Sequence, residues 1–307
     1  MEEDQLNIDE TTLSVDLSEA TDAVKEGSFE HALSLLKIIL KDHPEHIDSL
    51  YLAAVSSRYL RQFEESKKYI ESLLIIAPDM GRAYQELGHL NRDLGDEEKA
   101  VVHYRQACEL NPALTAGWNF LYQYFVKNNN KPAADHALEQ INKLRSLPAV
   151  LLYIDQILNE GRLGMAEAKC RAFLKENPTH TYAMSLLAEI ANRLGYFDDA
   201  EFLLEKAVEF TPDDGDLRMK YASILRKKQK FAKTMEQVNI LCDKYPDNLT
   251  YQAQKASEVM QNGDHETAIT LLDDILNKNP YNFSTFTSKG HAQKTLGKTD
   301  EAIKSYQ

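Results

Sequence analysis

Prolines recur at a constant interval along most of this chain. They form two runs, Pro44, Pro78 and Pro112, then Pro178, Pro212, Pro246 and Pro280, and within each run the spacing is 34 residues. A fixed period of this length with helical patterning in between is typical of stacked helix pairs, in which each repeat buries its apolar face only against its neighbours. The spacing therefore predicts an all-α solenoid.

The period also divides the chain into repeats. With each proline at position 32 of its repeat, an acidic N-terminal segment covers 1–12 and nine repeats follow, over 13–46, 47–80, 81–114, 115–146, 147–180, 181–214, 215–248, 249–282 and 283–307. The ninth repeat reaches only position 25, so its second helix lacks its later apolar positions. Because terminal repeats normally cap the core with a polar face, we expect a further domain beyond residue 307.

Two other columns keep the same period. Position 20 is alanine in seven of the nine repeats, which indicates a close crossing of two helices. Position 15 is glycine in six repeats and asparagine in a seventh, Asn129, whereas Arg61 and Gln229 are the exceptions. Glycine and asparagine favour the left-handed backbone that ends a helix and begins a tight turn. Each repeat is therefore expected to be helix A, a short turn and helix B.

Between these columns, apolar residues recur at steps of three and four, which is the period of an amphipathic helix. In 81–114 they are Tyr84, Leu87 and Gly88, followed by Ala100, Tyr104 and Ala107. This pattern resembles the tetratricopeptide repeat (TPR) almost column for column, and the resemblance extends over about 13–307. It implies a right-handed superhelical solenoid of helix-turn-helix units that binds a protein or peptide.

Composition and charge exclude other classes. The net charge of −13, from 48 acidic and 35 basic side chains, argues against nucleic acid, which needs clustered cations. No stretch has the roughly 18–20 apolar residues of a membrane span, so we expect no membrane insertion. Three cysteines lie at helix B positions suited to buried thiols, which favours a reducing cytoplasm; they are Cys108, Cys170 and Cys242. The oligomeric state stays open.

A search for chemistry assigns no catalytic, cofactor-binding or metal-ligating residues in these 307 residues. There is no phosphate-binding Gly-rich loop, no HExxH, no CxxC and no nucleophile elbow. His43 and His46 flank Pro44, and without a third ligand they are interpreted as turn residues. One concentrated basic run either complements a helix C-terminus in solvent or docks an acidic segment; it comprises Arg226, Lys227, Lys228 and Lys230.

Binding is the function left for such a scaffold. In the expected superhelix, positions 2, 5, 9, 12 and 13 of each helix A face a concave groove. In repeats two to four these positions carry a basic, amide-rich strip, the predicted peptide-binding groove: Arg58, Tyr59, Arg82, Gln85, His89, Arg92, Asn119, Gln123 and Lys127. Such a strip can pair with an extended acidic peptide. The alternative is an ordinary polar face without a fixed ligand.

A second resemblance covers about 215–307. The run from Gly290 to Gly297, Gly-His-Ala-Gln-Lys-Thr-Leu-Gly, is similar to the last repeats before the catalytic domain of bacterial TPR-linked sulfotransferases. It implies a substrate-recognition role and a following domain that binds 3′-phosphoadenosine 5′-phosphosulfate, whose loop is not found in these 307 residues. The alternative is a stand-alone TPR adaptor or assembly scaffold without an enzymatic domain.

One irregularity interrupts the array. Pro112 and Pro178 are 66 residues apart, two fewer than two repeats, and we assign the shortage to 115–146. Either the packing or the superhelix direction changes there, which would divide repeats one to four from five to nine, or a loop has lost two residues. Trp118, at core position 4 of that repeat, is predicted to be a packing residue.

Overall fold

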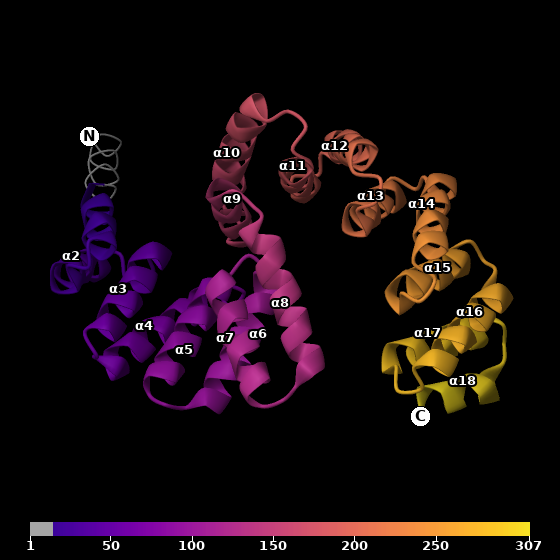
Figure 1. The fold of residues 1–307 in the computed structure, drawn as a ribbon, viewed down its shortest axis with the longest axis horizontal. Helices are drawn as coiled ribbons and strands as arrows, with labels where there is room; N and C mark the ends of the chain where they lie inside the picture. Colours follow the sequence, from indigo (N-terminus) through magenta and orange to yellow (C-terminus); the bar gives the residue numbers. More distant parts are fainter. Residues whose placement is uncertain (1–14) are drawn as a thin grey trace. The chain divides into compact units, whose positions relative to one another are not determined.

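The computed structural model describes residues 15–307, so the acidic segment 1–12 lies outside the described residues. Over 15–307 the chain forms helices and turns with no strand, which confirms the predicted all-α solenoid (Figure 1). It divides into two compact bodies, an N-terminal body up to Ala166 and a C-terminal body from Glu167. None of the helices in the described part is long and apolar enough to cross a membrane.

In the N-terminal body, residues 15–25 are helical and serve as the first helix A. The helices that follow are α2 (Phe29–Asp42), α3 (Ile47–Tyr59), α4 (Phe63–Ile76), α5 (Gly81–Asp93), α6 (Glu97–Leu110), α7 (Thr115–Lys127), α8 (Lys131–Arg145) and α9 (Ala149–Asn159).

The body boundary falls inside α10 (Leu163–Glu176). The C-terminal body continues with α11 (Thr181–Arg193), α12 (Phe197–Phe210), α13 (Gly215–Lys227), α14 (Phe231–Lys244), α15 (Leu249–Gln261), α16 (His265–Lys278), α17 (Phe283–Thr295) and α18 (Thr299–Tyr306). Odd-numbered helices from α3 onward are helices A and even-numbered ones are helices B.

Short polar side chains define where several helices A begin. Asn248 accepts hydrogen bonds from the backbone N–H groups of Thr250 and Tyr251 at the start of α15, and Asp214 accepts one at the start of α13. His46 does the same for α3 through Nδ1, so this predicted turn histidine is a helix cap. Such caps satisfy N–H groups that have no partner within the helix.

The turn between helix A and helix B has one backbone conformation in all nine repeats. The six glycines at position 15 have φ between 76° and 88°, which confirms their predicted left-handed conformation. Asn129 has φ 56°. The two exceptions in sequence are not exceptions in structure, since Arg61 and Gln229 have φ 58° and 57°. The repeat imposes the turn even where the residue disfavours it.

The close helix crossing predicted at position 20 is present throughout. All nine residues of that column are buried, and the two polar ones are hydrogen-bonded: Ser66 Oγ donates to Ala54 O and Thr234 Oγ1 donates to Lys230 O. The same crossing requires Gly88, where an added Cβ would lie 2.8 Å from the ring of Tyr104. The two helices of each hairpin therefore pack with their backbones close together.

The two-residue irregularity lies at a different place from the one predicted. α8 has 15 residues and α9 only 11, and α9 begins at Ala149 with Pro148 as its N-cap. The missing residues are therefore lost from the start of α9, because proline cannot continue the helix backward. The boundary between the bodies follows Ala166, about half a repeat after the predicted division. A change of superhelix direction stays a prediction.

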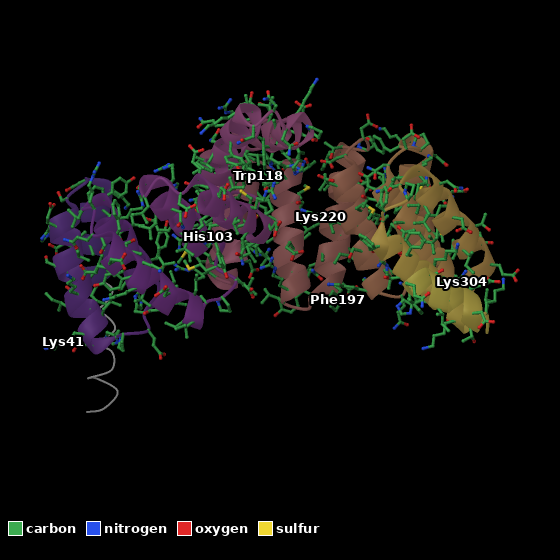
Figure 2. All side chains as sticks on the ribbon, turned by 90° about the horizontal axis from the view of Figure 1, so that it is seen from below. Lys41, His103, Trp118, Phe197, Lys220 and Lys304 are labelled. Carbon is green, nitrogen blue, oxygen red and sulfur yellow. The ribbon has the colours of Figure 1, made fainter. Side chains whose placement is uncertain are left out.

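Two predictions about buried side chains are confirmed. The three cysteines are buried free thiols, and burial raises the pKa of Cys108 to about 12 and that of Cys170 to about 11. Trp118, which is labelled in Figure 2, is partly buried against the core of α6 and α7. Its Nε1 donates to Pro112 O at 2.9 Å, and its ring meets His136 edge-on. It packs between helices, as expected of a core position.

Candidate functional site

Four of the nine predicted groove residues line one hollow in the N-terminal body. Arg58 and Tyr59 end α3, and His89 and Arg92 lie near the end of α5. The hollow has a volume of about 410 Å³ and is named here the arginine hollow; its lining is Arg58, Tyr59, Arg61, Phe63, His89, Arg92 and Asp93. Residues of the predicted strip from two neighbouring repeats therefore line the same hollow.

Arg58 forms the floor of the arginine hollow and is fixed by buried partners. Its side chain is 7% exposed, Nε donates to Glu86, and Nη1 donates to Asp93 Oδ2 at 3.0 Å. Burial alone would lower the pKa of this guanidinium, but the adjacent Glu86 carboxylate outweighs burial and raises it. Arg58 is therefore permanently charged, and Glu86 and Asp93 largely neutralise its charge within the fold.

His89 contributes no charge to the arginine hollow near neutral pH. Its Nδ1 is 2.6 Å from the hydroxyl of Tyr104. Burial first, and then the cations Arg58 and Arg92, lower the pKa of His89 to about 4. The ring is therefore neutral near pH 7 and is hydrogen-bonded to the tyrosine, so His89 is a packing group.

The rim of the hollow carries its accessible cations. Arg92 is 44% exposed and donates to Asp93 Oδ1 at 2.9 Å, whereas Arg61 is exposed in the left-handed turn. Tyr59 is 55% exposed and stacks on Phe29 with ring centroids 4.3 Å apart. The guanidinium of Arg58 also lies over this ring, 4.4 Å from its centroid, so the edge of the ring is what stays open. A carboxylate beside the ring edge could be held here by Arg61 and Arg92.

The other predicted residues lie elsewhere. Gln85 is on α5, and its Oε1 is buried without a hydrogen-bond partner among the described residues. On α7, Asn119 donates to Thr115 O of its own helix, Gln123 is exposed, and Lys127 pairs with Glu97 at 2.6 Å. These α7 residues do not line the arginine hollow.

Arg82 is paired with a residue for which the sequence predicted no role. Its Nε lies 2.5 Å from Glu160 Oε1, and its Nη2 donates to Glu160 Oε2 at 2.9 Å. Glu160 follows α9, three repeats after α3, and the adjacent Arg162 pairs with Asp48 of α3. The A-helix face of the N-terminal body is therefore concave, because α9 meets α3 and α5 across it.

The sequence held no signal for this cluster. Arg82 and Glu160 are 78 positions apart and Arg162 and Asp48 are 114 apart. Neither separation matches the 34-residue period between adjacent repeats. Only the accumulated curvature of several repeats brings these side chains together.

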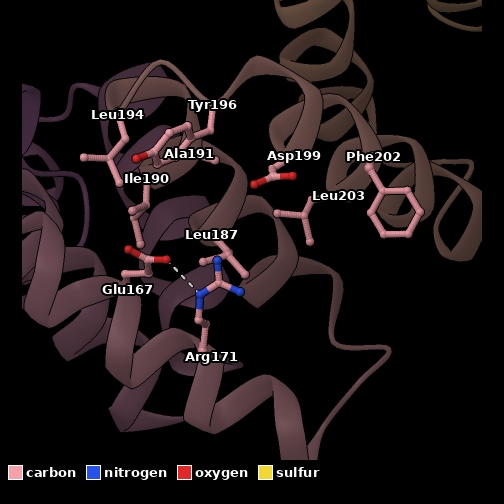
Figure 3. A pocket seen from close by; sticks show the side chains of 10 residues that line it. All are labelled: Glu167, Arg171, Leu187, Ile190, Ala191, Leu194, Tyr196, Asp199, Phe202 and Leu203. Carbon is pink, nitrogen blue, oxygen red and sulfur yellow. Dashed lines mark hydrogen bonds and ion pairs between the residues drawn. The ribbon is translucent and has the colours of Figure 1, made fainter.

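The C-terminal body has an apolar hollow of about 220 Å³ between α10, α11 and α12 (Figure 3). Its floor is apolar, from Leu187, Ile190, Ala191 and Leu203, and the pair of Glu167 and Arg171 lies at its edge. The repeat pattern did not predict this hollow, although one signal existed. Phe202, which is 60% exposed, stands in a column that carries mostly polar residues in the other repeats.

The basic run at the end of α13 complements a helix C-terminus, as one interpretation from the sequence has it, since Arg226 and Lys227 lie in the last turn of α13. Its side chains also have partners in neighbouring repeats. Lys228 and Lys230 both bind Glu201 of α12, with the Lys230 contact at 2.6 Å. Arg226 pairs with the buried Glu258 of α15 at 2.6 Å, and Lys227 donates to Asn192 Oδ1. These cations join neighbouring repeats, so they are not an open dock for an acidic segment.

Known families agree with this architecture of helix pairs. Models of the tetratricopeptide repeat match residues 81–114 and 283–307, and a second such model matches 158–237. These matches support the first resemblance drawn from the sequence, over the residues that the models cover.

Several solved structures match parts of this chain. A crystal structure of MamA has a TM-score of 0.45 and 18% identity and covers 50% of this chain and 90% of its own. MamA 41-end from Desulfovibrio magneticus RS-1 has a TM-score of 0.46 and 10% identity, with coverages of 52% and 92%. A structure of Naa15/Naa10 bound to HypK-THB has a TM-score of 0.40 and 17% identity; the match covers 92% of this chain but only 44% of that one.

Proposed function

We propose that this protein is a protein-interaction scaffold whose N-terminal body binds an extended acidic segment of a partner at the arginine hollow. The tetratricopeptide repeats support the general role. The observation that carries the specific site is the pair of rim cations, Arg61 and Arg92, beside the exposed ring of Tyr59.

The charge balance at the hollow favours an anionic ligand. Glu86 balances Arg58 in the floor, and Asp93 balances one of the two rim cations. One positive charge is left over at the rim. A ligand carboxylate can accept charge-assisted hydrogen bonds from a guanidinium, and an apolar side chain next to it can cover Tyr59 and Phe63.

The test requires variants that remove rim charge without disturbing the fold. Arg58 and Arg82 are unsuitable because both hold helices together. Arg61→Gly is suitable, since glycine accepts the left-handed turn more readily than arginine. Gln229→Gly is its matched control, because it makes the same backbone change at the same repeat position in the C-terminal body.

An array of acidic peptides, followed by titration of the hits, supplies the measurement. Each of Arg61→Gly and Arg92→Gln should weaken the hits about 5- to 10-fold at low salt, with loss of the salt dependence, because one charge-assisted hydrogen bond is lost. Gln229→Gly should bind as the wild type does. Unchanged binding in both arginine variants would remove the site assignment.

A finer proposal concerns the larger protein. The sequence from Gly290 to Gly297 favours a role in presenting an acceptor protein to a sulfotransferase domain that uses 3′-phosphoadenosine 5′-phosphosulfate. The coding sequence beyond Gln307 tests it, since a Gly-rich phosphate-binding loop opening an α/β domain is required. If a stop codon or further repeats follow instead, only the adaptor role remains. The proposed compartment is the cytoplasm, which the three buried thiols favour.

A further inference from the structure

A cluster of four charges closes the concave face of the N-terminal body. Asp48 of α3 and Arg82 of α5 lie on one side, and Glu160 and Arg162, which connect α9 to α10, lie on the other. Arg162 Nε is also 3.5 Å from Glu160 Oε2, and Arg82 Nη2 is 3.8 Å from Asp48 Oδ1. The cluster is neutral as a whole, with each cation facing both carboxylates.

Glu160 has the contacts that a bound carboxylate ligand would have. Its side chain is only 6% exposed. Arg82 Nη2 donates to one of its oxygens at 2.9 Å, and Arg82 Nε lies 2.5 Å from the other as an ion pair without hydrogen-bond geometry. The guanidinium of Arg82 in turn lies over the ring of Tyr51, 4.3 Å from its centroid. A guanidinium that is stacked on a ring and forked onto a carboxylate is a built recognition site for an acidic side chain.

The surroundings of the cluster leave room for more than one carboxylate. A cavity of about 430 Å³ adjoins it, and apolar side chains supply part of its wall, among them Leu17, Leu52 and Ile157. Lys25 also lines this wall, and it is paired with Asp22 at 2.7 Å. A segment that carries an acidic residue next to a leucine-like residue complements both the charge and the apolar wall.

We propose that Glu160 is an internal competitor that occupies, in the free protein, the position of an acidic side chain of the partner. The inference rests on the proposed binding of acidic segments and adds a second anchor on the same α3 and α5 pair. A partner carboxylate that enters the fork of Arg82 must displace Glu160. The affinity of the scaffold is therefore set partly by its own carboxylate, and the groove is self-occupied until a ligand with several acidic groups competes.

The decisive variant is Glu160→Gln, which keeps the size of the side chain and removes its charge. Competition predicts opposite effects on stability and binding, because the same carboxylate stabilises the free fold and excludes the ligand. We expect the midpoint of thermal unfolding to fall by about 5 °C. Affinity for a labelled peptide with alternating Glu and Leu should rise about 10-fold or more. A Gln-Leu peptide of the same length should not gain.

Two further variants complete the test. Glu189→Gln is the matched control, since Glu189 pairs with Arg193 within α11 of the C-terminal body and its substitution changes the net charge equally. It should leave peptide binding unchanged. Glu160→Asp keeps the charge but withdraws it by one methylene, so its gain in affinity for the acidic peptide should be smaller. This variant replaces Glu160→Gln in the test if the Gln variant does not fold.

The outcomes separate this inference from the proposed function. If the Glu160 variants bind the acidic peptide no tighter than the wild type, or no variant binds it at all, the competitor role is wrong. If they gain affinity while Arg61→Gly and Arg92→Gln have no effect, the competitor role stands and the arginine hollow is not the second anchor. A gain on the Gln-Leu peptide as large as that on the acidic one would also overturn the inference.

Discussion

The buried ion pair of Arg58 and Glu86 permits a quantitative test of how the N-terminal body is held together. Their side chains are 7% and 3% exposed, and they join α3 to α5. Removing one partner of such a pair leaves a buried charge uncompensated, which costs about 3–5 kcal/mol of unfolding free energy. Since Arg58 also donates to the more exposed Asp93, we expect Glu86→Gln near the lower end, about 3 kcal/mol.

The double variant Arg58→Met with Glu86→Leu removes both charges and keeps the volume nearly constant. Replacing a whole buried pair by apolar residues is often neutral, so we expect unfolding free energy within about 1 kcal/mol of the wild type. Arg58→Met alone completes the cycle and should again cost about 3 kcal/mol, because Glu86 is then left unpaired.

Urea unfolding followed by tryptophan fluorescence measures the right part of the molecule. Trp118 is the chain's one tryptophan and lies in the N-terminal body, so its signal reports the repeats next to the ion pair. With these values the coupling energy from the cycle should be about 5 kcal/mol. If the double variant loses as much stability as the single ones, the loss comes from packing, and the reasoning from an unpaired buried charge is refuted.

Three further predictions concern single positions. Arg61→Gly and Gln229→Gly should each raise unfolding free energy by about 0.5–1 kcal/mol in urea titrations, because both residues hold a left-handed φ that glycine adopts freely; a loss of stability would contradict this. Gly88→Ala should lower unfolding free energy by at least about 2 kcal/mol in the same measurement, since its Cβ would meet the ring of Tyr104 at 2.8 Å. An unchanged value would show that the ring moves without cost. Because burial lowers the pKa of His89 to about 4, the unfolded chain takes up the proton first as pH falls below the usual value of 6.5. Stability should therefore decrease by about 2–3 kcal/mol between pH 6.5 and pH 4, and His89→Gln should lack that part of the decrease.

The groove prediction was made from the repeat register alone. It placed Arg58, Tyr59, His89 and Arg92 on helices A of adjacent repeats, and the structure brings these four to one hollow. The register could not distinguish a cation that is available to a ligand from one that is paired within the fold. Arg58 proves to be buried and His89 neutral, because the burial of each depends on the side chains across the hairpin and not on its position in the repeat.

The amino-acid sequence by itself determined the repeated hairpins, the helix ends, the buried column at position 20 and the left-handed turns. All of these depend on local propensity and on contacts with the adjacent repeat, so a 34-residue period carries them. The sequence did not predict this turn at Arg61 and Gln229, which were exceptions to the glycine column, and the structure shows that they share the left-handed conformation.

Only the tertiary structure decided which polar side chains meet across the concave face. The contacts of Arg82 with Glu160 and of Arg162 with Asp48 span 78 and 114 positions. A small rotation between successive repeats accumulates over several of them before such residues come within hydrogen-bond distance. That curvature depends on how every helix pair packs against the next, and no single segment of the sequence encodes it.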